Sequence, residues 1–174
     1  MDKQLFLGSG KEVRIPPFFE LLKKEDITTL DINPDRDPDI IWDLNQHPLP
    51  FDDESFDQIF AFETLEHLGS LGDYRFFFKE FEEYWRILKK DGLFIASVPT
   101  MKSPWAFGDP GHTRYISKEM LGFLNQKSYE NAGPTNPISD YRFCYKANFE
   151  IAEHKYYYQD WIYVFILKKR EMPE

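Results

Sequence analysis

The sequence predicts an α/β fold in which helices cover a mostly parallel sheet of seven strands. Short apolar runs, such as 40–42 and 58–62, are bounded by turn residues, as in strands buried on both faces. A long amphipathic helix is expected between two of these runs, and alternating strands and helices indicate an α/β layered fold. The last two apolar runs are separated by only a few residues, which favours an antiparallel hairpin at the end of the sheet.

Length and charge limit the class of protein. A chain of 174 residues with 42% apolar residues suffices for one well-packed domain, so we expect a single domain over residues 1–174. The net charge is −9, from 30 acidic and 21 basic residues. Proteins that bind nucleic acid or anionic membranes usually carry a basic face. We therefore expect neither nucleic acid nor membrane as a partner.

Cysteine content and hydropathy indicate the compartment. Cys144 is the only cysteine, so neither an internal disulfide nor a thiolate zinc site is available. No apolar run approaches the length of a membrane span, and the N-terminus does not resemble a signal peptide. These features favour a soluble, cytoplasmic protein.

The first half of the chain predicts four strands. The first, Leu5–Leu7, ends at a tight turn, and Pro16-Pro17 then opens a helix with Leu21 and Leu22 in its apolar stripe. The second strand, 27–32, ends near Asp31. Two prolines make 33–38 a bare loop without a helix, so one crossover helix is missing, as is any helix before the first strand. The third and fourth strands are 40–42 and 58–62.

The second half predicts the main helix and three more strands. After a short helix or turn over 64–72, the helix spans Tyr74–Lys90, where Asp91-Gly92 ends it. The fifth strand is 93–98, followed by a long loop over 100–117. Ser117 then caps a helix of about nine residues. A polar stretch, 131–140, precedes the terminal hairpin, with strands at 149–158 and 161–167.

A glycine turn is the first candidate site. Gly8, Ser9 and Gly10 follow a strand, where glycine lets a ligand approach the backbone closely. Asp31 ends the next strand, a position from which an acid binds the hydroxyls of a ribose. The plainer alternative is an ordinary tight turn beside a surface aspartate. A dinucleotide site is disfavoured, because Val13 stands where its third glycine would be.

Two further acids follow the third and fourth strands. Asp43 comes after the first of these strands and Glu63 after the second. Ligands of open parallel sheets bind at the carboxyl ends of the strands, so both side chains are expected at one rim together with Asp31.

These residues carry a family resemblance. The segments that carry it are LFLGSG, TTLDINP, DIIWDLN with PLPFDDESFDQIFAFETLEHL, EEYWRILKKDGLFIASVP and SPWAFGDPGHTRYIS. Together they resemble class I S-adenosylmethionine-dependent methyltransferases, and are most similar to small type 11-like members associated with polysaccharide or lipopolysaccharide clusters. The resemblance implies a Rossmann-like fold with strand order 3-2-1-4-5-7-6, and S-adenosylmethionine as the cofactor.

The resemblance also implies roles for single residues. The turn Gly8-Ser9-Gly10 would lie beneath the methionyl part of the cofactor, and Asp31 would hold its ribose hydroxyls. Ile32 would also belong to the cofactor site. Asp43 would accept from the adenine amino group beside the backbone of Leu44. Glu63 would face the methionine end. The sequence departs from the family in having Leu7 where an acid usually precedes the glycine turn.

The loop after the fifth strand holds the candidate catalytic residues. His112 is a candidate general base towards an acceptor hydroxyl, with Asp109 orienting it. The alternative is a bracing cluster in which His112 and Arg114 bond backbone carbonyls. His67 is expected to brace the turn after the fourth strand, and Glu66 to form a salt bridge or face solvent.

No metal site is expected, because the histidines, His47, His67, His112 and His154, are scattered along the sequence without ligand spacing. The function predicted is methyl transfer from S-adenosylmethionine to a small-molecule or saccharide acceptor. The alternatives are a non-catalytic binding module of the same fold and a nucleotide-dependent oxidoreductase. Exposed aromatic residues would also suit a homodimer.

Overall fold

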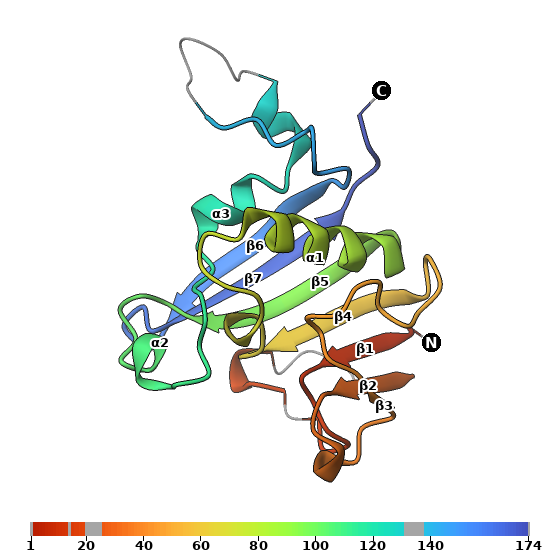
Figure 1. The fold of residues 1–174 in the computed structure, drawn as a ribbon, viewed down its shortest axis with the longest axis vertical. Helices are drawn as coiled ribbons and strands as arrows, with labels where there is room; N and C mark the ends of the chain where they lie inside the picture. Colours follow the sequence, from red (N-terminus) through yellow and green to blue (C-terminus); the bar gives the residue numbers. More distant parts are fainter. Residues whose placement is uncertain (1, 14, 20–25, 131–137, 174) are drawn as a thin grey trace.

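The strands form one seven-stranded sheet in the predicted order. The computed structural model describes residues 2–13, 15–19, 26–130 and 138–173. The order is β3-β2-β1-β4-β5-β7-β6, parallel from β3 to β5, with β7 antiparallel to both its neighbours (Figure 1). The strands are β1 Gln4–Leu7, β2 Ile27–Asp31, β3 Ile40–Ile41, β4 Phe56–Phe62, β5 Leu88–Pro99, β6 Phe149–Tyr157 and β7 Ile162–Lys169.

Within the described part of the chain the helices are few and mostly short. They are α1 Tyr74–Ile87, α2 Trp105–Gly108 and α3 Lys118–Gly122, with 3-10 turns η1 Pro17–Phe19, η2 Pro34–Arg36, η3 Leu65–His67 and η4 Gln126–Tyr129. In Figure 1, α1 crosses one face of the sheet in front of β5. The apolar stripe expected at Leu21 and Leu22, and most of the polar stretch 131–140, lie outside the described residues.

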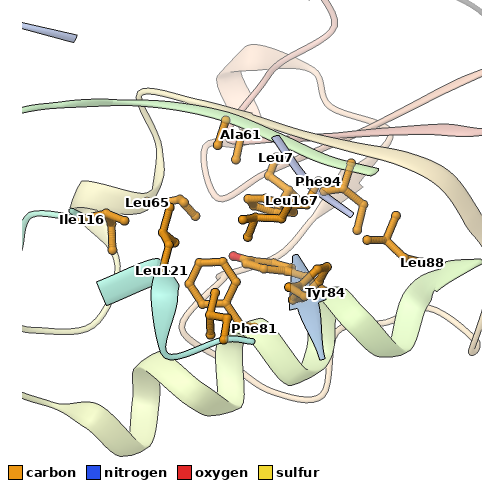
Figure 2. Packing of buried hydrophobic residues seen from close by; sticks show 14 of the residues in the cluster. Leu7, Ala61, Leu65, Phe81, Tyr84, Leu88, Phe94, Ile116, Leu121 and Leu167 are labelled. Atoms are coloured by element: carbon orange, nitrogen blue, oxygen red, sulfur yellow. The ribbon is translucent and has the colours of Figure 1, made fainter. Parts of the chain in front are cut away.

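The main core lies between α1 and the sheet. The side chain of Asp73 caps the helix by accepting from the backbone N–H of Phe76 over 3.0 Å. Helical spacing then places Phe81 and Tyr84 on the inner face, where Tyr84 stacks on Phe94 of β5 with ring centroids 4.6 Å apart. Figure 2 shows Phe81 and Tyr84 rising from the helix towards the strands.

The predicted end of α1 is wrong by three residues. The helix ends at Ile87, and Leu88 already pairs with Phe56 as the first residue of β5. Two lysines favour the extended chain: Lys169 donates from Nζ to the carbonyl of Leu88 over 2.6 Å, and Lys89 forms an ion pair with Asp57 at 2.7 Å. These partners are distant in sequence, so local helical periodicity gave no sign of them.

The connection from β2 to β3 was expected to be a bare loop, and this too was wrong in detail. Asn33 accepts from the N–H of Asp35 over 2.9 Å, and Pro34 opens the single 3-10 turn η2. The described chain has no longer helix here, as predicted. The expectation that both strands of the central stretch are buried fails for β3, because Ile41 is largely exposed at the sheet edge.

Three other expectations hold, two of them with changes. Ser117 caps α3 by accepting from the N–H of Met120, although the helix ends at Gly122. The loop over 100–117 contains one helical turn, α2. The terminal strands form the expected antiparallel hairpin. Among the described residues, no helix has both the length and the apolar character needed to cross a bilayer.

Candidate functional site

The turn after β1 requires its first glycine. Gly8 has φ +64°, and a Cβ there would lie 2.6 Å from Oγ1 of Thr64. Thr64 is held in place because its hydroxyl donates to the carbonyl of Phe62 over 3.1 Å. The glycine therefore lets β1 end directly against the segment that follows β4.

The second glycine is used for contact with the chain itself. A Cβ on Gly10 would lie 2.5 Å from the carbonyl oxygen of Arg36. The N–H of Lys11 donates to that same carbonyl over 3.0 Å, and its Nζ forms an ion pair with Asp37 at 2.7 Å. Ser9 donates from its hydroxyl to the carbonyl of Gly10. The glycine turn and η2 thus form one packed wall.

Asp31, the last residue of β2, is positioned by the loop that follows the strand. One carboxylate oxygen of Asp31 accepts from the backbone N–H of Asn33 over 2.8 Å, and the residue is 6% exposed. The next side chain, Ile32, is 63% exposed. A buried acid beside an exposed apolar side chain presents the two surfaces that a nucleoside needs, one for hydroxyls and one for a flat ring.

The acid after β3 is held by an asparagine that sequence reasoning missed. Oδ1 of Asp43 accepts from both the backbone N–H and the side-chain amide of Asn45, each at 2.9 Å. Oδ1 of Asn45 accepts in turn from the N–H of Gly69 over 2.8 Å, and Leu44 between the two is buried. Asn45 therefore ties the rim after β3 to the segment after β4.

The acid after β4 lies in a strained backbone conformation. Glu63 has φ +50°, which is uncommon for a residue with a side chain. Its Oε1 accepts from the hydroxyl of Ser97 on β5 over 2.8 Å. Burial raises the pKa of the Glu63 carboxyl above its ordinary value, and the hydrogen bond from Ser97 opposes this shift.

His112 lies in a buried cluster rather than in an open cleft. Its side chain is 8% exposed, and its Nε2 lies 3.9 Å from a carboxylate oxygen of Asp109 and 3.9 Å from one of Glu66. Both separations exceed a hydrogen bond. Asp109 instead accepts from the N–H of Gly111 over 2.7 Å. The structure thus places His112 and Asp109 together but without the direct orienting bond expected from the sequence.

The bracing role expected of this loop is only partly present. His67 makes its expected bracing contact, with Nδ1 3.1 Å from the carbonyl of Gly111. Arg114 donates to the carbonyl of Leu65 over 2.9 Å. The ring of His112, by contrast, makes no such bond, since its Nδ1 has no hydrogen-bond partner among the described residues.

Glu66 was expected at a salt bridge or in solvent, and the structure buries it. The residue is 1% exposed, and neither carboxylate oxygen has a hydrogen-bond partner among the described residues. Burial, reinforced by the negative charge of Glu63, raises the pKa of Glu66 to about 8. No sequence signal predicted this, because the partners that bury Glu66 lie some fifty residues further along the chain.

Two cavities lie near this end of the sheet. One, of about 630 Å³, is lined by the glycine turn and by the rings of Phe6, Phe60 and Phe62. It lies against the sheet face opposite α1, and Asp31, Asp43 and Glu63 do not line it. The second, of about 420 Å³, is lined by residues that include Lys102, Tyr115 and Tyr156.

The residues present fit an adenosine-bearing cofactor. Asp31, Asp43 and Glu63 follow three strands that, with β1, are hydrogen-bonded neighbours in the sheet. Their carboxylates therefore share the rim at which parallel sheets bind ligands. The buried carboxylate of Asp31 next to the exposed side chain of Ile32 supplies the observation that carries this fit.

Comparisons with known proteins agree with this architecture. A family model described as a methyltransferase domain matches residues 6–96, more than half of the chain. No curated protein matches the sequence.

Solved structures show the same fold at low sequence identity. A methyltransferase from Archaeoglobus fulgidus, described as S-adenosylmethionine-dependent, is 17% identical with TM-score 0.58, covering 97% of this chain and 86% of its own. A Haloferax volcanii putative methyltransferase, in complex with the activator Trm112, is 17% identical with TM-score 0.59, covering 98% and 83%. The Burkholderia thailandensis 1,6-didemethyltoxoflavin-N1-methyltransferase, solved with 1,6-didemethyltoxoflavin and S-adenosylhomocysteine, is 13% identical with TM-score 0.58, covering 98% and 72%.

At these identities the structural neighbours support the fold, and the family match over residues 6–96 supports the assignment. The chain belongs to the methyltransferase-domain family, within the class I S-adenosylmethionine-dependent methyltransferases.

Proposed function

We propose that this protein transfers a methyl group from S-adenosylmethionine to a small-molecule or saccharide acceptor. The observation that carries the proposal is the row of acids at the exits of β2, β3 and β4, beside the glycine turn after β1. When bound, the cofactor supplies a methyl group on a sulfonium, which is already activated for displacement. The protein's task is then mainly positioning.

Each acid takes a separate part of the cofactor. Asp31 holds the ribose hydroxyls, with Ile32 against the ring system, and Asp43 accepts from the adenine amino group beside Leu44. Glu63 faces the methionine end, where its negative charge favours a sulfonium. Gly8, Ser9 and Gly10 form the floor of the site. The contact of Thr64 with Gly8 supports this arrangement, because it fixes the turn against the segment after Glu63.

The acceptor is proposed to bind over the loop that follows β5. This loop carries His112 and Asp109, and it contributes Lys102 and Tyr115 to the cavity of about 420 Å³. That volume suits a small molecule or a sugar unit. Trp105 and Phe107 are 65% and 76% exposed, as suits rings that stack on an acceptor. In this proposal His112 takes the proton of an acceptor hydroxyl, with Asp109 3.9 Å from its ring.

A comparison supports a small acceptor. The Burkholderia thailandensis protein, which shares this fold, was solved with 1,6-didemethyltoxoflavin and S-adenosylhomocysteine bound. We further propose that residues 1–174 act as one domain, since all seven strands join one sheet. A homodimer that covers exposed aromatic side chains such as Phe143 stays a prediction.

One observation favours a second candidate, a binding module that does not catalyse. The backbone of Arg36 packs directly on Gly10, which takes up space above the second glycine. Such a module would bind the cofactor weakly, or bind it without turnover. The oxidoreductase alternative gains no support from the comparisons, and Val13 still stands where a dinucleotide site has glycine.

Ligand-dependent thermal stability tests the proposal. The protein is melted with S-adenosylmethionine, S-adenosylhomocysteine or NAD. A ligand at about one hundred times its dissociation constant adds about 2.7 kcal/mol to the free energy of unfolding. We expect stabilisation by the two sulfur nucleosides and not by NAD. An absence of stabilisation by both sulfur nucleosides would refute the proposal.

Two variants identify the site of that binding. Asp31→Asn keeps an oxygen that can accept from the N–H of Asn33 but loses the negative charge offered to the ribose. We expect Asp31→Asn to lose the rise in thermal stability that the sulfur nucleosides cause. Asp52→Ala removes an exposed acid from the turn before β4 and should keep the shift in full. Equal shifts in both variants would contradict the role of Asp31.

A further inference from the structure

Three potential metal ligands converge behind the rim. Glu66 and His67 lie in η3, directly after β4, and His112 comes from the loop after α2. One ligand atom of each lies within 4.8 Å of the others. Backbone hydrogen bonds hold this convergence in place, since the N–H groups of Thr113 and Arg114 both donate to the carbonyl of Glu66.

The carboxylate of Glu66 lacks a partner that would explain its burial. Neither of its oxygens is hydrogen-bonded among the described residues, although the side chain is almost fully buried. The nearby cation, Arg114, is already engaged: its Nη2 donates to Glu80 over 2.6 Å and its Nε to the carbonyl of Leu65. A buried carboxylate needs a proton or a cation. The surroundings of the Glu66 carboxylate are therefore suited to a positive ligand.

The two histidines place ring nitrogens near the carboxylate of Glu66. Nδ1 of His67 lies 3.1 Å from the carbonyl of Gly111, which can only accept, so the neutral ring carries its proton on Nδ1. Its Nε2 then keeps a free lone pair, as in metal-binding histidines whose other N–H donates to a backbone carbonyl. Nε2 of His112 lies 3.9 Å from Oε1 of Glu66, too far for a hydrogen bond.

The spacing is close to that of a coordination shell. Two ligand atoms bound at about 2.0–2.1 Å to one tetrahedral zinc ion lie roughly 3.3 Å apart. Contraction of the cluster by up to about 1.5 Å, through side-chain rotations, would bring the three ligand atoms to such a spacing. Asp109, with one carboxylate oxygen 3.9 Å from Nε2 of His112, is placed to become a fourth ligand.

We propose that Glu66, His67 and His112 bind a divalent transition-metal ion of the zinc type. Two imidazoles and one carboxylate form a donor set that suits zinc or iron(II) better than magnesium or calcium, which favour oxygen ligands. With Asp109 as the fourth ligand, the tetrahedral shell of the ion would be complete. With the ion bound, His112 is a ligand rather than the base, so the proposal changes the role of that residue. It does not depend on methyl transfer.

The test is zinc binding by the full chain after chelation and dialysis. Isothermal titration of the wild type with zinc chloride is expected to give one tight site, with magnesium chloride as a comparison that gives none. Glu66→Gln keeps the shape of the side chain and removes its charge, and is expected to weaken zinc binding about tenfold or more. His67→Gln is a second ligand variant on an exposed position. His154→Ala, an exposed histidine on β6, should bind zinc like the wild type.

Each outcome decides the proposal. Stoichiometric zinc binding that both ligand variants weaken and His154→Ala leaves intact supports it. The absence of stoichiometric binding in the wild type overturns it, as does a Glu66→Gln or His67→Gln variant with wild-type affinity. Circular dichroism of every variant separates loss of the site from loss of the fold. Because no cofactor is present, failure here leaves the cofactor-binding test on Asp31 unaffected.

Discussion

Arg114 and Glu80 form a fully buried ion pair, with Nη2 of the arginine 2.6 Å from a carboxylate oxygen of the glutamate. Arg114 also donates to the carbonyl of Leu65, so it joins α1 to η3 and to the loop of His112. Arg114→Met should lower the free energy of unfolding by about 3–5 kcal/mol, since it leaves the buried charge of Glu80 without a counter-charge and with only the hydroxyl of Tyr84 as a partner. Urea unfolding measures this loss.

Two controls separate charge from packing. Adding Glu80→Gln to Arg114→Met removes the stranded charge and should restore part of the stability. Arg142→Met breaks an ion pair with Asp140 in which both side chains are exposed, and should cost under about 1 kcal/mol. A loss at Arg142 equal to that at Arg114 would contradict the account.

Gly8→Ala should destabilise the protein by about 1–3 kcal/mol, because it combines a positive φ with a clash against Thr64. Gly72 is a matched control: its φ is +86°, but a Cβ there would meet nothing within 4 Å. Gly72→Ala should therefore show the cost of the backbone conformation alone. Thr64→Ala should partly rescue Gly8→Ala in thermal unfolding, and a lack of rescue would argue against the contact.

Protonation of His47 should lower the free energy of unfolding in mild acid. Burial lowers the pKa of the His47 ring below its ordinary value of 6.5, an effect larger than that of nearby Glu83 and Lys79. A group with a lowered folded pKa contributes stability that is present above 6.5 and is lost as the pH falls through the folded value. His47→Gln should flatten this part of the stability curve from pH 7 to 5, whereas His154→Ala should leave it unchanged.

Asn45→Ala should weaken cofactor binding more than it weakens the fold. The variant removes the amide that donates to Asp43 and the oxygen that accepts from Gly69. A hydrogen bond to a charged group contributes about 1.5–3 kcal/mol, so we expect a rise of roughly tenfold or more in the dissociation constant for S-adenosylhomocysteine. Calorimetric titration measures it. An unchanged constant would show that Asp43 does not need this support.

Two features of the fold were predictable from the sequence. The strand order followed from the family resemblance, and the cap of α3 followed from the local pattern around Ser117. The early end of α1 could not be predicted, because Lys169 and Asp57, which stabilise Leu88–Lys89 as strand, are remote in sequence. Periodicity reports only what neighbours along the chain prefer.

Some residues of the candidate site were likewise predictable from the sequence, and others were not. The acids at strand ends were visible because each follows its own apolar run. The assembly of Glu66, His67 and His112 was not, since the two segments are brought together by hydrogen bonds from Thr113 and Arg114 to the carbonyl of Glu66. Asn45 was missed because nothing near it in sequence reveals its contact with Gly69.

The segment from Asp31 to Asp37 combines local hydrogen bonds with contacts to the glycine turn. Three hydrogen bonds lie within it. The carboxylate of Asp31 accepts from the N–H of Asn33, and the side chain of Asn33 accepts from the N–H of Asp35. The carbonyl of Pro34 accepts from the N–H of Asp37. The bond to the Asp31 carboxylate thus comes from two residues further along the chain, while the ion pair of Lys11 with Asp37 ties the end of the segment to the glycine turn. Grafted after a strand of another parallel sheet, the segment should therefore keep the bond from Asn33 to Asp31 but lose its attachment to the glycine turn.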